Sequence, residues 1–256
     1  MLIDSHIHLD AAEFAPDRAA VIVAARAAGV RGFVVPAVDR ASFDTVLALA
    51  AARGDVCPAL GIHPLYVMQA QDGDLDRLAE LLGAGVARAV GEIGLDHFVS
   101  DVDPERQLRF FTAQLGLARE HGLPVILHVR RAIEPILREL RRAQVNGGIA
   151  HAFNGSRQQA DAFIALGFRL GFGGAMSFEG STRIRELARS LPLESIVLET
   201  DAPDIAPAWA RGERNLPENL PRYARILAEL RGMEVAEVIE TTGRNLVETL
   251  GGWQPR

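Results

Sequence analysis

The chain has 256 residues and a formal net charge of −6, and 48% of its residues are hydrophobic. This length fits one large α/β domain or two small ones. No linker or shift in composition divides the chain, so we predict a single domain over residues 1–256. The acidic balance argues against a broad basic surface for nucleic acid, although bound metal could supply positive charge locally.

The absence of lysine and the single cysteine exclude several catalytic mechanisms and any intrachain disulfide bond. All 27 residues counted as lysine or arginine are arginine, which excludes Schiff-base chemistry, a P-loop lysine and a carbamylated lysine between two metals. Cys57 is the only cysteine, so no intrachain disulfide can form, and we expect it in the core. Residues 1–6 lack the features of a signal peptide, and no apolar run approaches the roughly 20 residues of a membrane span. We therefore expect a cytoplasmic protein with no membrane association, and no obligate protein partner is evident.

Short apolar runs alternate with longer helical segments along the chain. The predicted strands are Leu2–His6, Gly32–Pro36, Val56–Gly61, Ala87–Glu92, Val125–His128, Gly148–His151, Arg169–Gly171 and Ser195–Thr200. The predicted helices lie near residues 17–28, 41–53, 74–83, 104–121, 131–143, 156–166, 181–190, 217–231 and 234–250. Eight strands that alternate with helices favour a closed α/β barrel, the (β/α)8 TIM barrel, over an open doubly wound sheet.

In such a barrel the chemistry lies where the strands end and the next loops begin. Six of the seven histidines lie at or just beyond the end of a predicted strand: His6, His8, His63, His97, His128 and His151. Carboxylates stand at two further strand ends, as Glu92 and Asp201. Two histidines two positions apart, as in His6-Ile7-His8, point to one face of a strand. This coincidence predicts a metal site at the C-terminal ends of the strands.

The predicted ligands divide into two groups. His6, His8 and Asp201 can hold one ion, because the first and last strands of a closed barrel are neighbours. His128 and His151, on adjacent strands, can hold a second ion. Glu92 is the carboxylate that would bridge the two, since the chain has no lysine to carbamylate. Mixed imidazole and carboxylate ligands suit zinc or manganese first, with cobalt, iron and magnesium as alternatives, although magnesium prefers sites made of oxygen ligands alone.

A hydroxide that bridges two such ions would be the nucleophile at neutral pH, and Asp201 could accept its proton. His63 is either a substrate contact, a ligand to a third metal or a histidine that supports the ligands. Arg130 shares the strand face of His128, and its guanidinium would suit a phosphate or carboxylate. Glu199 is expected to support a ligand or an arginine by hydrogen bonding. Loop residues with weaker claims to the site are Asp96, Asn154 and Arg157.

With these residues in place, the chain resembles the TatD family of metal-dependent hydrolases, within the amidohydrolase superfamily. The matching segments are DSHIHLD at residues 4–10, GIHP at 61–64, GEIGLD at 91–96, LPVILHVR at 123–130, HAFNGS at 151–156, LETDAP at 198–203, RNLP at 214–217 and TTGRN at 241–245. The resemblance covers nearly the whole chain, in order.

The resemblance implies a TIM barrel with two or three divalent metals and phosphodiester hydrolysis. The usual family activity is that of a deoxyribonuclease, often a 3′–5′ exonuclease acting on DNA ends. By resemblance the metal ligands are His6, His8, Glu92, His128, His151 and Asp201. The sequence departs from the family pattern at five positions. The family usually has an aromatic residue in place of His97, serine in place of Asn154 and tyrosine in place of Asp204. It usually has an acidic residue in place of Arg131 and of Leu216.

Three functional hypotheses follow from these residues. The first is a metal-dependent phosphodiesterase that acts on DNA ends, and on RNA as a further substrate. The second is a hydrolase of small esters, lactones or amides that uses the same pair of metals. The third is a catalytically idle metal-binding protein that serves as an interaction module, which the full set of ligands disfavours. An assay of metal-loaded protein on end-labelled single-stranded DNA, beside small esters, separates the first two.

Overall fold

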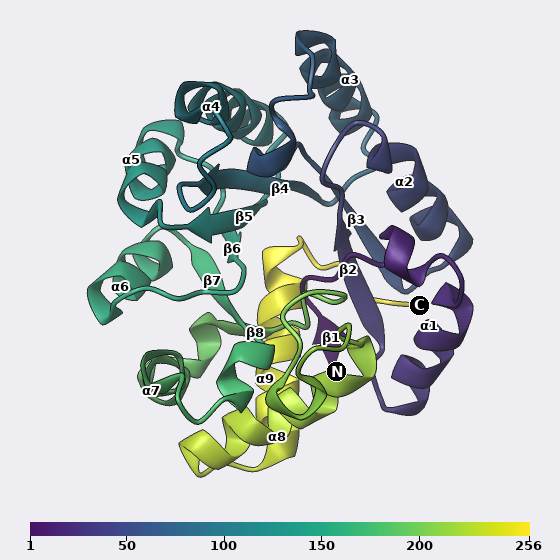
Figure 1. Cartoon of the computed structure of the whole chain (residues 1–256), viewed down its shortest axis with the longest axis vertical. Coiled ribbons are helices and arrows are strands. Elements are labelled where there is room, and N and C mark those ends of the chain that lie inside the picture. The colour runs from purple at the N-terminus through teal and green to yellow at the C-terminus, as the bar shows by residue number, and fades with distance from the viewer.

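The computed structural model describes all residues 1–256, and eight parallel strands follow one another in sequence order around a barrel (Figure 1). The strands are β1 (Ile3–Asp4), β2 (Gly32–Pro36), β3 (Val56–Leu60), β4 (Ala89–Asp96), β5 (Val125–Arg130), β6 (Gly148–Ala150), β7 (Phe168–Phe172) and β8 (Ile196–Leu198). Backbone hydrogen bonds just beyond β1 and β8 bring the first and last strands together, from Ser5 N–H to Leu198 O (3.0 Å) and from Asp201 N–H to His6 O (2.8 Å). The TIM barrel predicted from the sequence is confirmed.

Helices surround the strands on the outside of the barrel (Figure 1). They are α1 (Arg18–Ala27), α2 (Ser42–Ala52), α3 (Asp72–Gly83), α4 (Pro104–Glu120), α5 (Ile133–Ala143), α6 (Arg157–Ala165), α7 (Thr182–Ser190), α8 (Leu220–Arg231) and α9 (Val235–Thr249). Short 3₁₀ turns lie at Ala12–Phe14, Pro64–Tyr66, Gly174–Ser177, Leu193–Ser195, Ala208–Ala210 and Pro217–Asn219. All nine predicted helices are present within a few residues of the expected bounds. None of them is both long enough and apolar enough to cross a membrane.

Only β2 has the predicted bounds, and the other strands differ from the prediction by one to four residues at an end. Two of these differences affect the site. Strand β1 ends at Asp4, so His6 and His8 follow the strand and do not lie within it. Strand β4 continues four residues beyond the predicted end at Glu92 and carries Asp96. The extension depends on Gly94, which has φ +152° and lies so close to β5 that a Cβ would stand 2.0 Å from His128 O. A bulge between Val90 and Ile93 shifts the β4–β5 register just where Glu92 enters the barrel.

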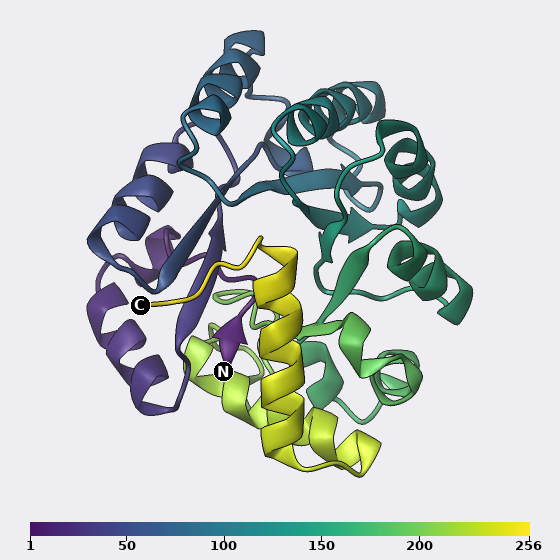
Figure 2. The ribbon, with the colours of Figure 1, turned by 180° about the vertical axis from the view of Figure 1, so that it is seen from behind.

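The barrel has one closed end and one polar end. At the end where the strands begin, inward-facing apolar side chains form a buried layer: Ile3, Val34, Cys57, Ala59, Ala89, Ile126, Ile149 and Val197. Helix α9 lies across this end (Figure 2), and Leu246 of α9 and Leu250, directly after it, join the layer. Cys57 is fully buried there, which confirms its place in the core. The polar residues predicted to form the site all lie toward the opposite end, which we call the mouth.

Candidate metal centre

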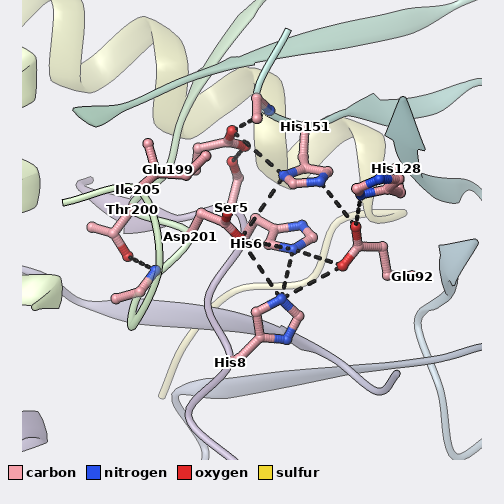
Figure 3. A network of polar contacts seen from close by, with 12 residues as sticks. Ser5, His6, His8, Glu92, His128, His151, Glu199, Thr200, Asp201 and Ile205 are labelled. Carbon is pink, nitrogen blue, oxygen red and sulfur yellow. Dashed lines mark hydrogen bonds and ion pairs between the residues drawn. The ribbon is translucent and has the colours of Figure 1, made fainter. Parts of the chain in front are cut away.

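Five histidines converge on Glu92 and Asp201 at the mouth of the barrel, and Figure 3 draws His6, His8, His128 and His151 around these carboxylates. They are His6, His8, His63, His128 and His151. His6 and Glu92 are almost inaccessible to solvent, at 0% and 2% exposure. Side chains from β4 and β5, and from the residues that follow β1, β3, β6 and β8, therefore meet at one point, as the sequence predicted.

The first donor group lies around His6 Nε2. This atom is 3.3 Å from His8 Nε2, 3.2 Å from Glu92 Oε2 and 3.4 Å from Asp201 Oδ1. His8 Nε2 is 3.5 Å from Glu92 Oε2 and 3.6 Å from Asp201 Oδ1. Four ligands bound tetrahedrally at metal distances of 2.0–2.1 Å are about 3.4 Å apart. The donors therefore already have the spacing of ligands around one ion.

The second donor group lies around the other oxygen of the same carboxylate. Glu92 Oε1 is 2.9 Å from His151 Nε2, 3.1 Å from His128 Nδ1 and 3.4 Å from His63 Nε2. Each oxygen of Glu92 thus faces a different set of imidazole nitrogens, which is the arrangement required of a bridging carboxylate. His128 and His151, which are predicted to hold the second ion, both lie against this oxygen. The tighter three-residue groups join His151 to His6 and Glu92, and His128 to His63 and Glu92.

A hydrogen bond from the backbone of Leu65 determines which nitrogen of His63 carries the proton. Leu65 N–H donates a hydrogen bond to His63 Nδ1 at 3.2 Å, so this nitrogen has a free lone pair. Burial lowers the pKa of His63 to about 4, and the ring is therefore neutral with its proton on Nε2. That N–H points toward Glu92 Oε1. Of the roles that the sequence left open, this tautomer favours a hydrogen-bond donor over a ligand to a third metal.

Glu92 is ionised, and its negative charge favours positively charged groups in the cluster. Burial opposes ionisation of Glu92, but His151, His63 and His6 hold its pKa well below the usual range. Burial would lower the pKa of His151, yet Glu92, Asp201 and Glu199 raise it to about 10. Burial lowers the pKa of His6 to about 3, leaving its ring neutral and able to act as a ligand. The donor set, the spacing and the charge all fit divalent cations.

Asp96 holds His128 from the side away from Glu92. Its Oδ2 is 3.0 Å from His128 Nε2, and its Oδ1 accepts hydrogen bonds from the backbone N–H groups of Phe98 and Val99. Gln107 brackets the backbone of Asp96, accepting from its N–H at 2.9 Å and donating to its carbonyl oxygen at 3.0 Å. This orientation leaves His128 Nδ1 facing Glu92. The prediction of Asp96 as a loop residue is wrong, because it is buried at the end of β4.

A second buried network fixes the backbone beside Asp201. Asp4 accepts hydrogen bonds from the N–H and the hydroxyl of Thr200, and burial raises its pKa to about 7. The Asn215 side chain is wholly buried and donates to Thr200 O at 2.7 Å, tying down the loop after β8. These contacts hold the turn in which Asp201 adopts φ +57°.

Glu199 supports the site through the backbone. Its Oε1 accepts a hydrogen bond from Ala152 N–H, directly after His151, and lies 3.9 Å from His151 Nδ1. The absence of a side chain at Gly171 makes space for the Glu199 carboxyl group, since a Cβ there would lie 2.0 Å from Glu199 Oε2. Burial raises the pKa of Glu199 to about 8. Glu199 thus supports a histidine of the cluster, one of the two roles expected, and forms no ion pair with an arginine.

Other residues singled out in the sequence lie outside the cluster. Arg130 is exposed at the mouth, with its guanidinium over Phe98. Asn154 is exposed and accepts a hydrogen bond from Arg183, and Arg157 is paired with Asp161 at the start of α6, so it is not a loop residue. His97 follows β4 and is exposed.

Several residues that position the site have no role predicted from the sequence: Asp4, Gln107, Phe98, Thr200 and Asn215. Asp96, by contrast, was among the candidates, and its place on β4 could have been inferred because it lies four positions after Glu92 and so shares its side of a strand. The others act through contacts with backbone groups far away in the sequence. No pattern of residue types shows such contacts.

Comparison with known proteins identifies the family. The family described as TatD related DNase matches residues 3–251. The chain belongs to this family. The metal-dependent hydrolase YjjV of Escherichia coli strain K12 is 39% identical over 246 residues, covering 95% of each chain. A 3′–5′ ssDNA/RNA exonuclease TatD of Pectobacterium carotovorum is 32% identical, covering 95% of this chain and 97% of that protein.

The solved structures agree with the sequence comparison. The crystal structure of YjjV from E. coli superimposes with a TM-score of 0.93 and 37% identity, covering 97% of each chain. A TatD family hydrolase from Entamoeba histolytica gives a TM-score of 0.86 at 19% identity, which shows the shared fold. The resemblance predicted from the motifs is confirmed, and the chain is a metal-dependent hydrolase of the TatD family.

Proposed function

We propose that the chain is a divalent-metal-dependent phosphodiesterase that removes nucleotides from the 3′ ends of single-stranded DNA and RNA. The observation that carries the proposal is the position of Glu92, whose two oxygens each face a separate group of imidazoles. A pair of divalent ions held by these residues would suit in-line displacement at phosphorus, since both the attacking and the leaving oxygen carry charge. The name of the Pectobacterium relative, an exonuclease, supports this substrate class.

The proposed ligands are His6, His8 and Asp201 for one ion, His128 and His151 for the other, and Glu92 for both. Zinc or manganese fits this mixture of nitrogen and oxygen donors best. When bound, two such ions would polarise the phosphoryl group and lower the pKa of water toward 7. A third ion is not needed to account for His63, because its Nε2 is a donor.

The side chains themselves would orient the substrate and move protons. Asp201 Oδ1 faces His6 and His8, and no protein group hydrogen-bonds its Oδ2. This second oxygen is the proposed acceptor of the proton from the attacking water. His63 Nε2–H would donate to a phosphoryl oxygen or to Glu92. Asp96, on β4, and Glu199, directly after β8, would keep His128 and His151 in position.

The test is hydrolysis of single strands by protein loaded with zinc or manganese. Oligothymidylate labelled at its 5′ end should shorten one nucleotide at a time, whereas a 3′ label should be released at once as a mononucleotide. A panel of neutral esters, lactones and amides is assayed in parallel. Turnover of the small neutral substrates with intact oligonucleotides would overturn the proposal in favour of the second hypothesis. Glu92→Gln, loaded in the same way, serves as the control for contaminating nuclease.

A further inference from the structure

An exposed aromatic ring with two guanidinium groups stands beside the metal centre. The guanidinium carbon of Arg130 lies 3.8 Å from the centroid of Phe98, and that of Arg131 lies 4.6 Å from it. The Phe98 side chain is 48% exposed. Both arginines are exposed, and neither forms an ion pair or a hydrogen bond with another side chain. We call Phe98, Arg130 and Arg131 the arginine platform.

The arginine platform is joined directly to the ligands. Arg130 follows His128 by two residues on β5, which is about 7 Å along a strand. Phe98 N–H donates to Asp96, whose other oxygen lies against His128. A backbone hydrogen bond from His97 N–H to Arg130 O (2.9 Å) also holds the loop after β4 against β5. The platform therefore has a fixed position relative to the cluster.

The backbone at Arg131 makes the arrangement possible. Consecutive side chains of a strand point to opposite faces, so Arg130 and Arg131 would normally diverge. Arg131 instead has φ +53°, a left-handed conformation that is unfavourable for a residue with a side chain. This turn brings both guanidinium groups to one ring. Such strain persists where the surroundings enforce it, and it is frequent at binding sites.

Phe110 also lies against two arginines, but in an arrangement with a purely structural role. Arg106 and Arg109 lie 5.1 and 5.0 Å from the Phe110 ring, but that ring is fully buried. Arg106 donates to two backbone carbonyls, and Arg109 is paired with Asp72. In the arginine platform, by contrast, the ring is open and the guanidinium donors are unused. Free donors in an acidic protein are suited to an anion from outside.

We infer that the arginine platform binds the phosphates of a single strand next to the scissile bond, so that the enzyme favours oligonucleotides over small diesters. This inference rests on the proposed function. The planar guanidinium presents paired N–H donors that match phosphate oxygens. Phe98 would hold both groups in place by cation–π contact, which reduces the ordering required when the strand binds.

The experiment compares two substrates and one binding reaction. KM and kcat are measured for oligothymidylate and for bis(p-nitrophenyl) phosphate, and binding of fluorescent oligothymidylate is followed by anisotropy across a salt series. Variants are Arg130→Ala, Arg131→Ala, Phe98→Ala and Phe98→Tyr. Arg244→Ala, which removes one exposed charge from α9 at the closed end, is the matched control. Thermal unfolding shows that each variant is folded.

Arg130→Ala and Arg131→Ala should each raise KM for oligothymidylate about tenfold or more, and raise it less for the small diester. Each should also reduce the slope of log K against log salt by about 0.7, the value for one phosphate contact on a single strand. Phe98→Ala should weaken binding, and Phe98→Tyr should restore it. Arg244→Ala should change neither KM nor the slope.

Two results would overturn the inference: an unchanged salt slope in both arginine variants, or equal losses on the two substrates. Failure of the proposed function looks different, because the parent protein would then hydrolyse neither diester. In that case the anisotropy measurement still decides about the platform. Tight binding of oligothymidylate that is weakened by Arg130→Ala and Arg131→Ala supports the inference. Binding that is unchanged in both variants contradicts it.

Discussion

The closed end of the barrel and its mouth are made from the same strands, yet they bury opposite kinds of side chain. At the closed end, aliphatic residues pack against Leu246 of α9 and Leu250 directly after it, so burial itself stabilises the fold. At the mouth, burial raises the pKa of Asp4 to about 7 and that of Glu199 to about 8, which shows that burial disfavours the ionised form of these carboxyl groups. The comparison predicts that substitutions at the closed end change stability, whereas those at the mouth change metal binding and turnover.

Glu92→Gln should have the largest effect at the mouth. A neutral amide has only one oxygen to offer and cannot bridge two cations, so both donor groups lose their shared member. Turnover should fall to background, a larger loss than the about 10²–10⁴-fold expected of a general base alone. Metal content, measured by elemental analysis after gel filtration, should fall together with activity. Two retained metals with near-normal turnover would show that Glu92 does not bridge.

Asp201→Asn should separate proton transfer from metal binding. The amide oxygen can still ligate weakly beside His6 and His8, but the side chain can no longer accept a proton. Turnover on oligothymidylate should therefore fall by about 10²–10⁴-fold. Metal occupancy, measured on the same preparation, should fall far less than it does in Glu92→Gln. If occupancy and turnover decline in parallel, Asp201 serves as a ligand only.

Leu246→Ala tests the closed end. The side chain is 1% exposed within the apolar layer, and its truncation leaves a cavity between α9 and the strands. The free energy of unfolding should fall by about 2–5 kcal/mol, as for other buried leucines. Turnover per folded molecule should stay at the parent value, because no ligand touches this layer. Denaturant titration and assays well below the melting temperature check the two statements, and a matching loss of kcat would contradict the separation of the two ends.

The same contrast explains how far the sequence could predict the structure. Apolar periodicity depends on local burial, which is why all eight strands and nine helices could be placed from the sequence. The convergence of His6 and His8 was also expected, but for an incomplete reason, since β1 ends at Asp4 and both histidines lie beyond it. A closed barrel brings strand ends together whatever the local conformation, so the cluster survives that error.

The parts that could not be predicted depend on contacts between side chains and remote backbone groups. Glu199 was expected to bind a side chain, but its strongest contact is the N–H of Ala152. Arg130 was expected beside the metal ligands, but residue types could not show the left-handed turn at Arg131 or the stacking of both guanidinium groups on Phe98. Residue type shows which donors and acceptors exist. It does not show which backbone group each will meet.

Asp96→Asn should have a smaller effect, and one on metal affinity more than on chemistry. The carboxylate holds His128 Nε2 while Nδ1 faces Glu92. Partners of this kind are typically worth about 10–100-fold in metal affinity. Titration with a zinc chelator should show one of two ions released more readily, with the ion held by His6 and His8 unaffected. Equal weakening of both ions would mean that the change disturbs β4 as a whole.

The smallest effect is expected from His63, and it decides between the roles that the sequence left open. Its Nδ1 accepts the Leu65 N–H, so its Nε2 is a donor directed at Glu92 Oε1. Loss of one such hydrogen bond in His63→Ala should raise KM or lower kcat by about 2- to 10-fold, in line with about 0.5–1.5 kcal/mol for a single bond. Metal stoichiometry should not change. His63→Gln, whose amide N–H can still donate, should recover part of the loss. If His63→Ala instead releases an ion and His63→Gln does not restore it, His63 is a ligand, and a third ion belongs to the site.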